Sequence, residues 1–186
     1  MLLKVDAIQR LEWYREWFER RGRSAFLSEF PHPVLVAREN LETETEASFH
    51  TAFMSRSQFL AELQKGGSSA PDDRPQIRAG EVRLVRKAAG AAFADRVGVG
   101  RARNADVWLP NPRVSKYHAY FSGTSDAGYT LTDADSRNGT WIDGEKLAPR
   151  TPVPLAEGSE VVFGPHRFTF YTAAGFCENI GRRARS

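Results

Sequence analysis

The sequence predicts an all-β fold, a β-sandwich of two mostly antiparallel sheets, preceded by a partly helical N-terminal extension. From Glu81 onward apolar residues alternate with polar ones, as expected of short strands that bury one face in a core. Turn residues separate these runs, for example in "SGTSDAG", "SRNG" and "GP". No helical pattern lies between the runs, which argues against a parallel α/β sheet. These observations favour a sandwich over a doubly wound fold.

The first segment is predicted to be helical. In "VDAIQRLEWYREWFERRGR" apolar residues recur at helical spacing, and Gly22 is a typical stop signal. The acidic residues of this segment weaken any attraction to anionic lipid, so we expect the helix to pack on the protein's own core. A short strand is expected at Val34–Val36, and a second short helix capped by Ser57 follows it. Together these elements form the expected extension over residues 1–64.

Changes of amino-acid composition mark the boundaries of the linker, the sandwich and the C-terminal tail. Residues 65–80, "KGGSSAPDDRPQIRAG", are rich in Gly, Ser, Pro and Asp and predict a flexible linker. The sandwich is expected over residues 81–173. Within it, "IDGEKL" predicts a two-residue hairpin, because Asp-Gly suits the positive φ angles of a type I′ turn. Residues 174–186 are expected to form a basic C-terminal tail.

The alternating apolar residues that predict the strands are Val82 and Leu84; Phe93, Val97 and Val99; Val107 and Leu109; Tyr117, Ala119 and Phe121; Tyr129 and Leu131; Val161 and Phe163; and Phe168 and Phe170.

Composition limits the classes of function. The 186 residues are 41% hydrophobic, which is enough for one sizeable core. The net charge is only +3 and no dense basic run precedes the C-terminal "GRRARS", so we do not expect a nucleic-acid partner. Cys177 is the only cysteine, which excludes an internal disulfide and a cysteine-based zinc site. The chain shows neither a secretory signal nor an apolar run that could span a bilayer, so we expect a cytoplasmic protein without a membrane partner.

Catalytic and cofactor motifs are incomplete. "GVGRAR" has Arg103 where a dinucleotide-binding fingerprint needs its third glycine, and no phosphate-binding P-loop is present. Ser115 and His118 could be combined with Asp133 or Asp135 into a triad, but no nucleophile elbow accompanies them. The histidines are scattered without ligand spacing, so no metal site is expected. We therefore expect no enzyme activity and no cofactor.

Three loops carry residues suited to a phosphate. Arg101 follows a strand-like run, Ser115 lies one short strand later beside Arg113 and Lys116, and Arg137-Asn138 occupies the next loop. If these loops meet at one end of the sandwich, arginine can hold a phosphate dianion with two parallel charge-assisted bonds, and serine can donate a third. An asparagine amide can both donate to and accept from a peptide backbone. The alternative is that the basic loop residues are simply solvated.

The order of short motifs resembles the forkhead-associated (FHA) domain. The chain has "GR", then "SKYH", then "NG", embedded in "VGRARNADVWL", "VSKYHAYF", "LTDADSRNGTWIDGEKL" and "LAEGSEVVFG". The resemblance covers residues 81–172, and the first eighty residues do not share it. It implies an FHA-type sandwich of eleven short strands whose loops bind a phosphothreonine peptide without catalysis.

The resemblance also implies a role for each residue of the motifs. Arg101 and Ser115 would hold the phosphate, and Asn138 would hold the peptide backbone just after the phosphothreonine. Basic neighbours would favour acidic peptides, and further positions would shape the loops. The basic neighbours are Lys116, Arg137 and Arg113; the shaping residues are Gly100 and Gly139, which keep the turns, and His118, which braces the loop from inside.

The expected function is a cytoplasmic adaptor that recognises proteins phosphorylated by a Ser/Thr kinase, with the kinase itself as a further partner. One alternative is an interaction scaffold that binds its partner without phosphate. Another is a self-inhibited regulator, in which a phosphorylated Thr43 or Thr45 of the acidic "LETETEAS" reaches back to the chain's own FHA domain.

Overall fold

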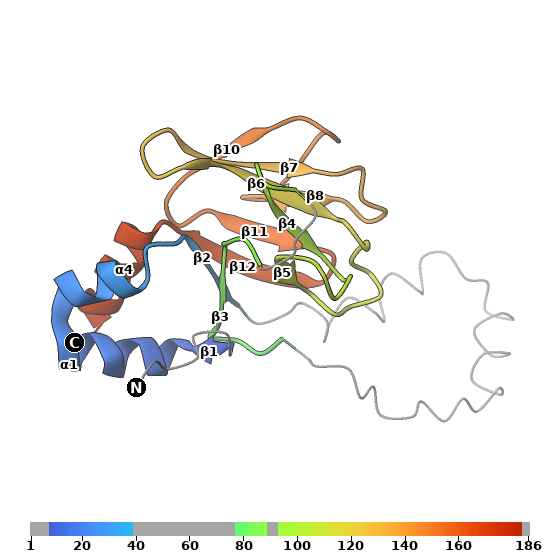
Figure 1. Ribbon diagram of the computed structural model, residues 1–186. Coiled ribbons are helices and arrows are strands. Elements are labelled where there is room, and N and C mark those ends of the chain that lie inside the picture. Colours follow the sequence, from blue (N-terminus) through green and yellow to red (C-terminus); the bar gives the residue numbers. More distant parts are fainter. Residues whose placement is uncertain (1–7, 39–76, 89–92, 184–186) are drawn as a thin grey trace, which may run out of the picture.

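The computed structural model describes residues 8–38, 77–88 and 93–183. The expected second helix, most of the expected linker, and both Thr43 and Thr45 lie outside these residues. The described chain forms two packed β-sheets, with two helices beside them (Figure 1). The predicted fold class, a mostly antiparallel β-sandwich preceded by a helix, is confirmed.

The larger sheet has seven strands and the smaller has five. Their orders are β1-β3-β2-β12-β11-β8-β9 and β10-β7-β6-β4-β5. Every neighbouring pair is antiparallel except β4 and β5. The described residues contain twelve strands, where eleven were expected: β3 to β12 lie within the expected sandwich, and β1 and β2 precede it. The strands are β1 (Gln9–Arg10), β2 (Val34–Ala37), β3 (Glu81–Leu84), β4 (Val97–Gly100), β5 (Val107–Trp108), β6 (Ala119–Thr124), β7 (Gly128–Asp133), β8 (Thr140–Ile142), β9 (Glu145–Lys146), β10 (Val153–Leu155), β11 (Glu160–Phe163) and β12 (His166–Tyr171).

The main core lies between the two sheets and is built from alternate residues of the strands, as strand geometry requires. Phe121 and Leu131 enter it from the smaller sheet, and Phe163 and Phe170 enter it from the larger one. All four are buried. The hairpin predicted in "IDGEKL" is present between β8 and β9, where Asp143 has φ 49° and Gly144 has φ 86°, as a type I′ turn requires.

The predicted strand at Val34–Val36 exists, but it belongs to the sandwich and not to a separate extension. As β2 it lies between β3 and β12 in the larger sheet. Leu35 and Ala37 point into the main core, whereas Val34 and Val36 pack on the opposite face of the sheet. The expected boundary between an extension at 1–64 and a sandwich that begins at residue 81 is therefore corrected.

The expected linker also ends earlier than Gly80. Ile77 is buried in the main core because its apolar side chain fills space between the sheets. The backbone N–H of Gly80 donates to the carbonyl of Ala37 over 2.8 Å, and Leu11 N–H donates to the carbonyl of Gly80 over 2.8 Å. Residues 77–80 are therefore part of the fold.

Helix α1 spans Leu11–Glu29 and is interrupted at Gly22, whose φ of 77° and ψ of 176° are not helical. The predicted stop at Gly22 thus breaks the helix, but the chain resumes helical geometry after it. The second helical segment brings Phe26 into contact with the aromatic rings of Tyr14 and Phe30. Burial of the Phe26 side chain among these rings stabilises the second helical segment, which explains why the chain returns to helical geometry after Gly22.

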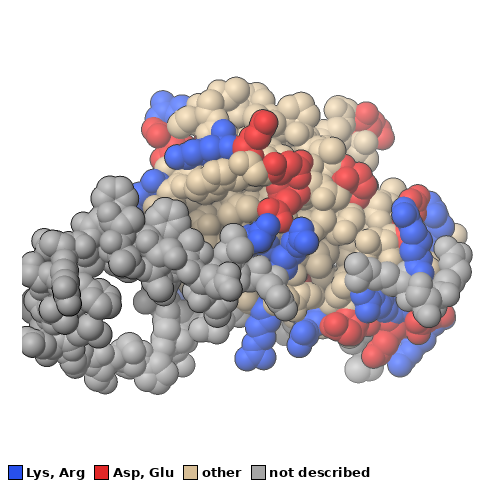
Figure 2. Space-filling model, turned by 180° about the vertical axis from the view of Figure 1, so that it is seen from behind, with Lys and Arg blue, Asp and Glu red and all other residues tan. Residues whose placement is uncertain are grey.

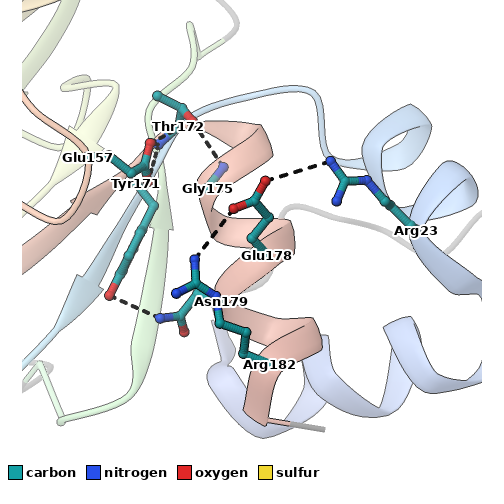
Figure 3. A network of polar contacts seen from close by, with 8 residues as sticks. All are labelled: Arg23, Glu157, Tyr171, Thr172, Gly175, Glu178, Asn179 and Arg182. Atoms are coloured by element: carbon teal, nitrogen blue, oxygen red, sulfur yellow. Dashed lines mark hydrogen bonds and ion pairs between the residues drawn. The ribbon is translucent and has the colours of Figure 1, made fainter. Parts of the chain in front are cut away.

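The expected basic tail is instead a second helix, α4, over Ala173–Arg183. Phe176, Cys177 and Ile180 are buried at helical spacing, a pattern that the terminal arginines obscure in the sequence. The helix begins with a cap, because Gly175 N–H donates to Thr172 Oγ1 over 3.1 Å (Figure 3). Thr172 Oγ1 in turn donates to the carboxylate of Glu157 over 2.8 Å.

Helices α1 and α4 pack together and enclose a second core against the outer face of the larger sheet (Figure 1). Its buried members are Tyr14, Phe26, Phe30, Val34, Val82, Phe176, Cys177 and Ile180. The structure therefore has three layers, formed by the helices, the seven-stranded sheet and the five-stranded sheet. At the surface of the helical layer, Glu178 pairs with Arg23 and Arg182 (Figure 3).

Candidate functional site

The loop after β4 and the loop before β6 run side by side. Arg101 N–H donates to the Ser115 carbonyl over 3.0 Å, and Ala102 N–H donates to the Lys116 carbonyl over 3.3 Å. These bonds bring the backbone of the "GR" motif against that of the "SKYH" motif. The side chains of Arg101 and Lys116 are both exposed to solvent.

Gly100 makes this close approach possible. A Cβ atom at Gly100 would lie 2.1 Å from the carbonyl oxygen of Lys116, a distance at which the backbone would have to move. The Gly100 carbonyl also accepts a hydrogen bond from Leu109 N–H over 2.9 Å. The glycine is therefore required by packing between two backbones.

The third loop, between β7 and β8, is joined to the loop before β6 through Ser115 and Asn138. Arg137 N–H donates to Ser115 Oγ over 3.1 Å, which leaves the hydroxyl proton able to donate to a ligand. Asn138 Nδ2 donates to the carbonyl of Arg113 over 2.6 Å. The Asn138 carbonyl oxygen and its second N–H proton remain suited to a peptide backbone. The structure therefore brings the predicted residues of all three loops together.

His118 lies beneath these loops and is fully buried. Its Nδ1 accepts a hydrogen bond from Ser115 N–H over 3.0 Å, and its Nε2 lies 2.9 Å from the Gly139 carbonyl. Because Nδ1 accepts and the carbonyl needs a donor, the ring is neutral with its proton on Nε2. Burial lowers the pKa of His118, although the Gly139 carbonyl and Asp133 act in the opposite direction. The neutral ring joins the loop of Ser115 to the loop of Asn138.

A second buried group, Asp133, shapes the Asn138 loop, whereas the sequence had brought it up only as a member of a rejected catalytic triad. The Asp133 carboxylate accepts hydrogen bonds from Ser136 N–H over 2.9 Å, from Ser136 Oγ over 2.7 Å and from Thr140 Oγ1 over 2.5 Å. Burial alone would raise the pKa of Asp133, but these hydrogen bonds hold it below its usual value. Gly139 N–H completes the turn by donating to Ser136 Oγ over 3.0 Å. The signal was the polar spacing in "DADSRNGT", where an aspartate can bond the backbone three residues later.

The candidate site is rich in uncompensated positive charge. Arg101, Lys116 and Arg137 are exposed, and none of them forms an ion pair with a carboxylate of the described residues. Elsewhere the charge is mixed, since Figure 2 shows acidic and basic side chains interspersed over the face seen from behind. No cluster of potential metal ligands occurs in the part of the chain that the structure describes. None of the helices in that part is both long enough and apolar enough to cross a membrane.

Comparison with known proteins identifies the domain. Residues 97–164, from β4 to β11, match the family model of the FHA domain. The chain therefore contains an FHA domain. Strands β2, β3 and β12 and both helices lie outside the matched residues. No curated protein matches the chain.

Several solved structures are similar to this chain. Mycobacterium tuberculosis EmbR, in complex with a low affinity phosphopeptide, is 27% identical with a TM-score of 0.42 over 51% of this chain, and the match spans 22% of EmbR. The N-terminal FHA domain of S. cerevisiae Rad53p, in complex with a phosphothreonine peptide, is 24% identical with a TM-score of 0.40 over 45% of this chain and 73% of its own. The FHA domain of Chlamydia trachomatis CT664 is 15% identical with a TM-score of 0.44 over 75% of this chain and 96% of its own.

Proposed function

We propose that this protein binds phosphothreonine peptides through the three loops at the end of its FHA sandwich. The observation that carries the proposal is the contact of His118 with both Ser115 and Gly139, which joins the loop of Ser115 to the loop of Asn138 by hydrogen bonds within the chain itself. A preorganised site loses less conformational freedom on binding than a set of separate loops would. This supports a site that is ready for a ligand.

A phosphate group fits the charge and donors of this site. Phosphothreonine carries a charge of about −1.5 to −2 at neutral pH and has three strong acceptor oxygens. Arg101 offers a planar guanidinium for two parallel hydrogen bonds, and Ser115 keeps its hydroxyl proton for a third. Asn138 then binds the peptide backbone just after the phosphothreonine. Gly100 and Gly139 allow the loops to take this shape.

The surrounding cations set the preference for the peptide sequence. Lys116 and Arg137 are exposed beside the proposed phosphate position, and Arg113 is fixed at the site by the bond between its carbonyl and Asn138. Complementary charge increases the association rate and selects against unsuitable partners. We therefore propose that Asp or Glu is favoured in the residues that follow the phosphothreonine.

The chemistry of the site is binding, and we propose no catalytic role for it. The partners are proteins phosphorylated on threonine by a Ser/Thr kinase, and the chain acts in the cytoplasm as a signalling adaptor. Neither a cofactor nor a nucleic acid is needed for this function.

The deciding experiment measures binding of a degenerate phosphothreonine peptide library, followed by fluorescence anisotropy with selected peptides. Truncating one partner of a desolvated charge pair costs about 2–5 kcal/mol, so Arg101→Ala should weaken binding by at least about tenfold. Lys116→Ala should have a much smaller effect, because an exposed ion pair contributes only about 0.2–1 kcal/mol.

The unphosphorylated form of each selected peptide serves as the ligand control. Binding that survives removal of the phosphate, or that is the same in Arg101→Ala, would refute the proposal. Such a result would favour the phosphate-independent scaffold instead.

A further inference from the structure

Lys146 on β9 lies against the loop that carries Asn138. A Cβ atom placed on Gly139 would lie 2.5 Å from Lys146 Cε and 3.3 Å from Lys146 Nζ. The lysine stem and its ammonium group therefore cover the backbone of Gly139. Lys146 lies in the stretch "LTDADSRNGTWIDGEKL", where the motifs gave it no role, and it is adjacent to Gly139 in space.

The position of this lysine is fixed by the β8–β9 hairpin. Lys146 pairs with Trp141 across the two strands, and its Nζ lies 5.6 Å from the centroid of the Trp141 ring. The quadrupole of an aromatic ring attracts a cation held over its face. Trp141 thus keeps the ammonium group near the loop, on a rigid hairpin rather than at the end of a free stem.

The charge of Lys146 is uncompensated within the described residues. Its side chain is exposed, and no described carboxylate forms an ion pair with it. By contrast, Arg150 in the following loop pairs with Asp135 over 3.1 Å. Lys146 is therefore a held cation beside the proposed peptide site whose charge remains available to a ligand.

We propose that Lys146 determines specificity by binding an acidic side chain of the phosphopeptide, at one position close to the phosphothreonine. This inference rests on the proposed phosphopeptide function and adds to it a contact outside the three phosphate-binding loops. The peptide backbone held by Asn138 passes beside Gly139, so a neighbouring Asp or Glu side chain comes within reach of the ammonium group. Trp141 contributes indirectly, by positioning the lysine.

The test compares phosphothreonine peptides that carry Asp or Asn at each flanking position in turn. Lys146→Met keeps an unbranched stem that extends to the Cε atom over Gly139 but removes the charge, and Lys146→Gln provides a second uncharged variant with a polar end. Both should reduce the preference for Asp over Asn about two- to fivefold at one position only, as expected for an exposed ion pair. Lys146→Arg should retain the preference. The preference in the wild-type chain should also decline with added salt.

Arg20→Gln is the matched control, because it removes the same charge from an exposed position on α1. Thermal unfolding shows that each variant is folded. The inference would be overturned if Lys146→Gln and Lys146→Met kept the full preference for Asp. It would also be overturned if these variants lost the preference equally at every flanking position and Arg20→Gln showed the same loss. Either result would leave phosphopeptide binding itself intact. Failure of the folded wild-type chain to bind any phosphothreonine peptide would instead overturn both this inference and the proposed function.

Discussion

Two buried histidines make the sandwich sensitive to acid. His166 is only 4% exposed, and neither of its ring nitrogens has a hydrogen-bond partner in the described structure. Burial lowers the pKa of His166 to about 4, and the nearby positive charge of Arg83 adds to this effect. Burial lowers the pKa of His118 as well. Both rings are therefore neutral in the folded protein at pH values where they would be charged in the unfolded chain.

The free energy of unfolding should fall as the pH is lowered from about 6.5 to about 4. In this window the unfolded chain binds protons that the folded chain does not, so stability that is present above pH 6.5 is lost. His166 alone accounts for about 3 kcal/mol, from a pKa difference of about 2.5 units. Because the pKa of Asp133 is lowered in the folded chain, its contribution to stability is lost at a lower pH, near the ordinary carboxyl pKa. This change has the same direction as that of the histidines.

Urea denaturation at a series of pH values measures the effect. His166→Phe retains a ring of similar size without a titrating nitrogen, so its stability should depend less steeply on pH than that of the wild-type chain. A wild-type stability that is flat between pH 7 and pH 4.5 would contradict this account of the buried histidines.

The residues of the candidate site were largely predictable because their roles depend on short local motifs. Gly100-Arg101, Ser115 to His118 and Asn138-Gly139 can each be recognised within a few neighbours. Lys146 could not be recognised in this way. The predicted "IDGEKL" hairpin pairs Lys146 with Trp141, but the contact of Lys146 with Gly139 depends on how its side chain packs across that hairpin, which the spacing does not give.

At the level of elements, alternation predicted most strands but not their ends. Tyr117 was expected to share the buried face of Ala119 and Phe121, yet it is 36% exposed because β6 begins only at Ala119. Phe93 is 46% exposed for the same reason, since it precedes β4. Strand β10 was not predicted, because the prolines of "TPVPL" are atypical of strands.

Helix α4 was not predicted, because its apolar residues can be recognised as a buried helix face only when the residues they pack against are known. Phe176 lies between the aromatic rings of Tyr14, Phe26 and Tyr171, and these come from α1 and β12. The arginine-rich C-terminal sequence gives no sign of these aromatic partners. The second core is thus a property of the assembled fold.

Phe176→Ala should lower the free energy of unfolding by about 3–5 kcal/mol, the usual cost of removing a buried aromatic side chain. Urea denaturation of the full chain measures this loss. Arg182→Gln on the exposed side of the same helix is the control and should change stability by less than about 0.5 kcal/mol. A loss for Phe176→Ala as small as that of the control would mean that α4 contributes little to the fold.

At the level of the whole molecule, the FHA sandwich depends on residues that precede its motifs. Strand β2 supplies backbone partners to both β3 and β12, and Leu35 fills the main core from the middle of the sheet. The sequence predicted this strand but not its place, because pairing between residues so far apart is set by topology. A domain defined only by its family match would lack this strand.

A fragment that begins at Glu81 should therefore fail to fold, whereas a chain that begins at Ile8 should fold like the full protein. The shorter fragment loses β1, β2 and α1, which leaves β12 without one of its two neighbours and both cores open. Far-UV circular dichroism and amide chemical-shift dispersion distinguish the two outcomes. A cooperative unfolding transition in the fragment from Glu81 would show that β2 is dispensable.

The hydrogen bond between Gly80 N–H and the Ala37 carbonyl has a consequence for how this protein can vary. The chain leaves the larger sheet at the end of β2 and returns beside the same point before β3, so the sheet itself holds these two points of the backbone together. Doubling the length of such a connection costs only about 0.6 kcal/mol in closure entropy. This junction can therefore accept an inserted tag, a reporter or an entire additional domain while both cores and the loops of the candidate site keep their geometry.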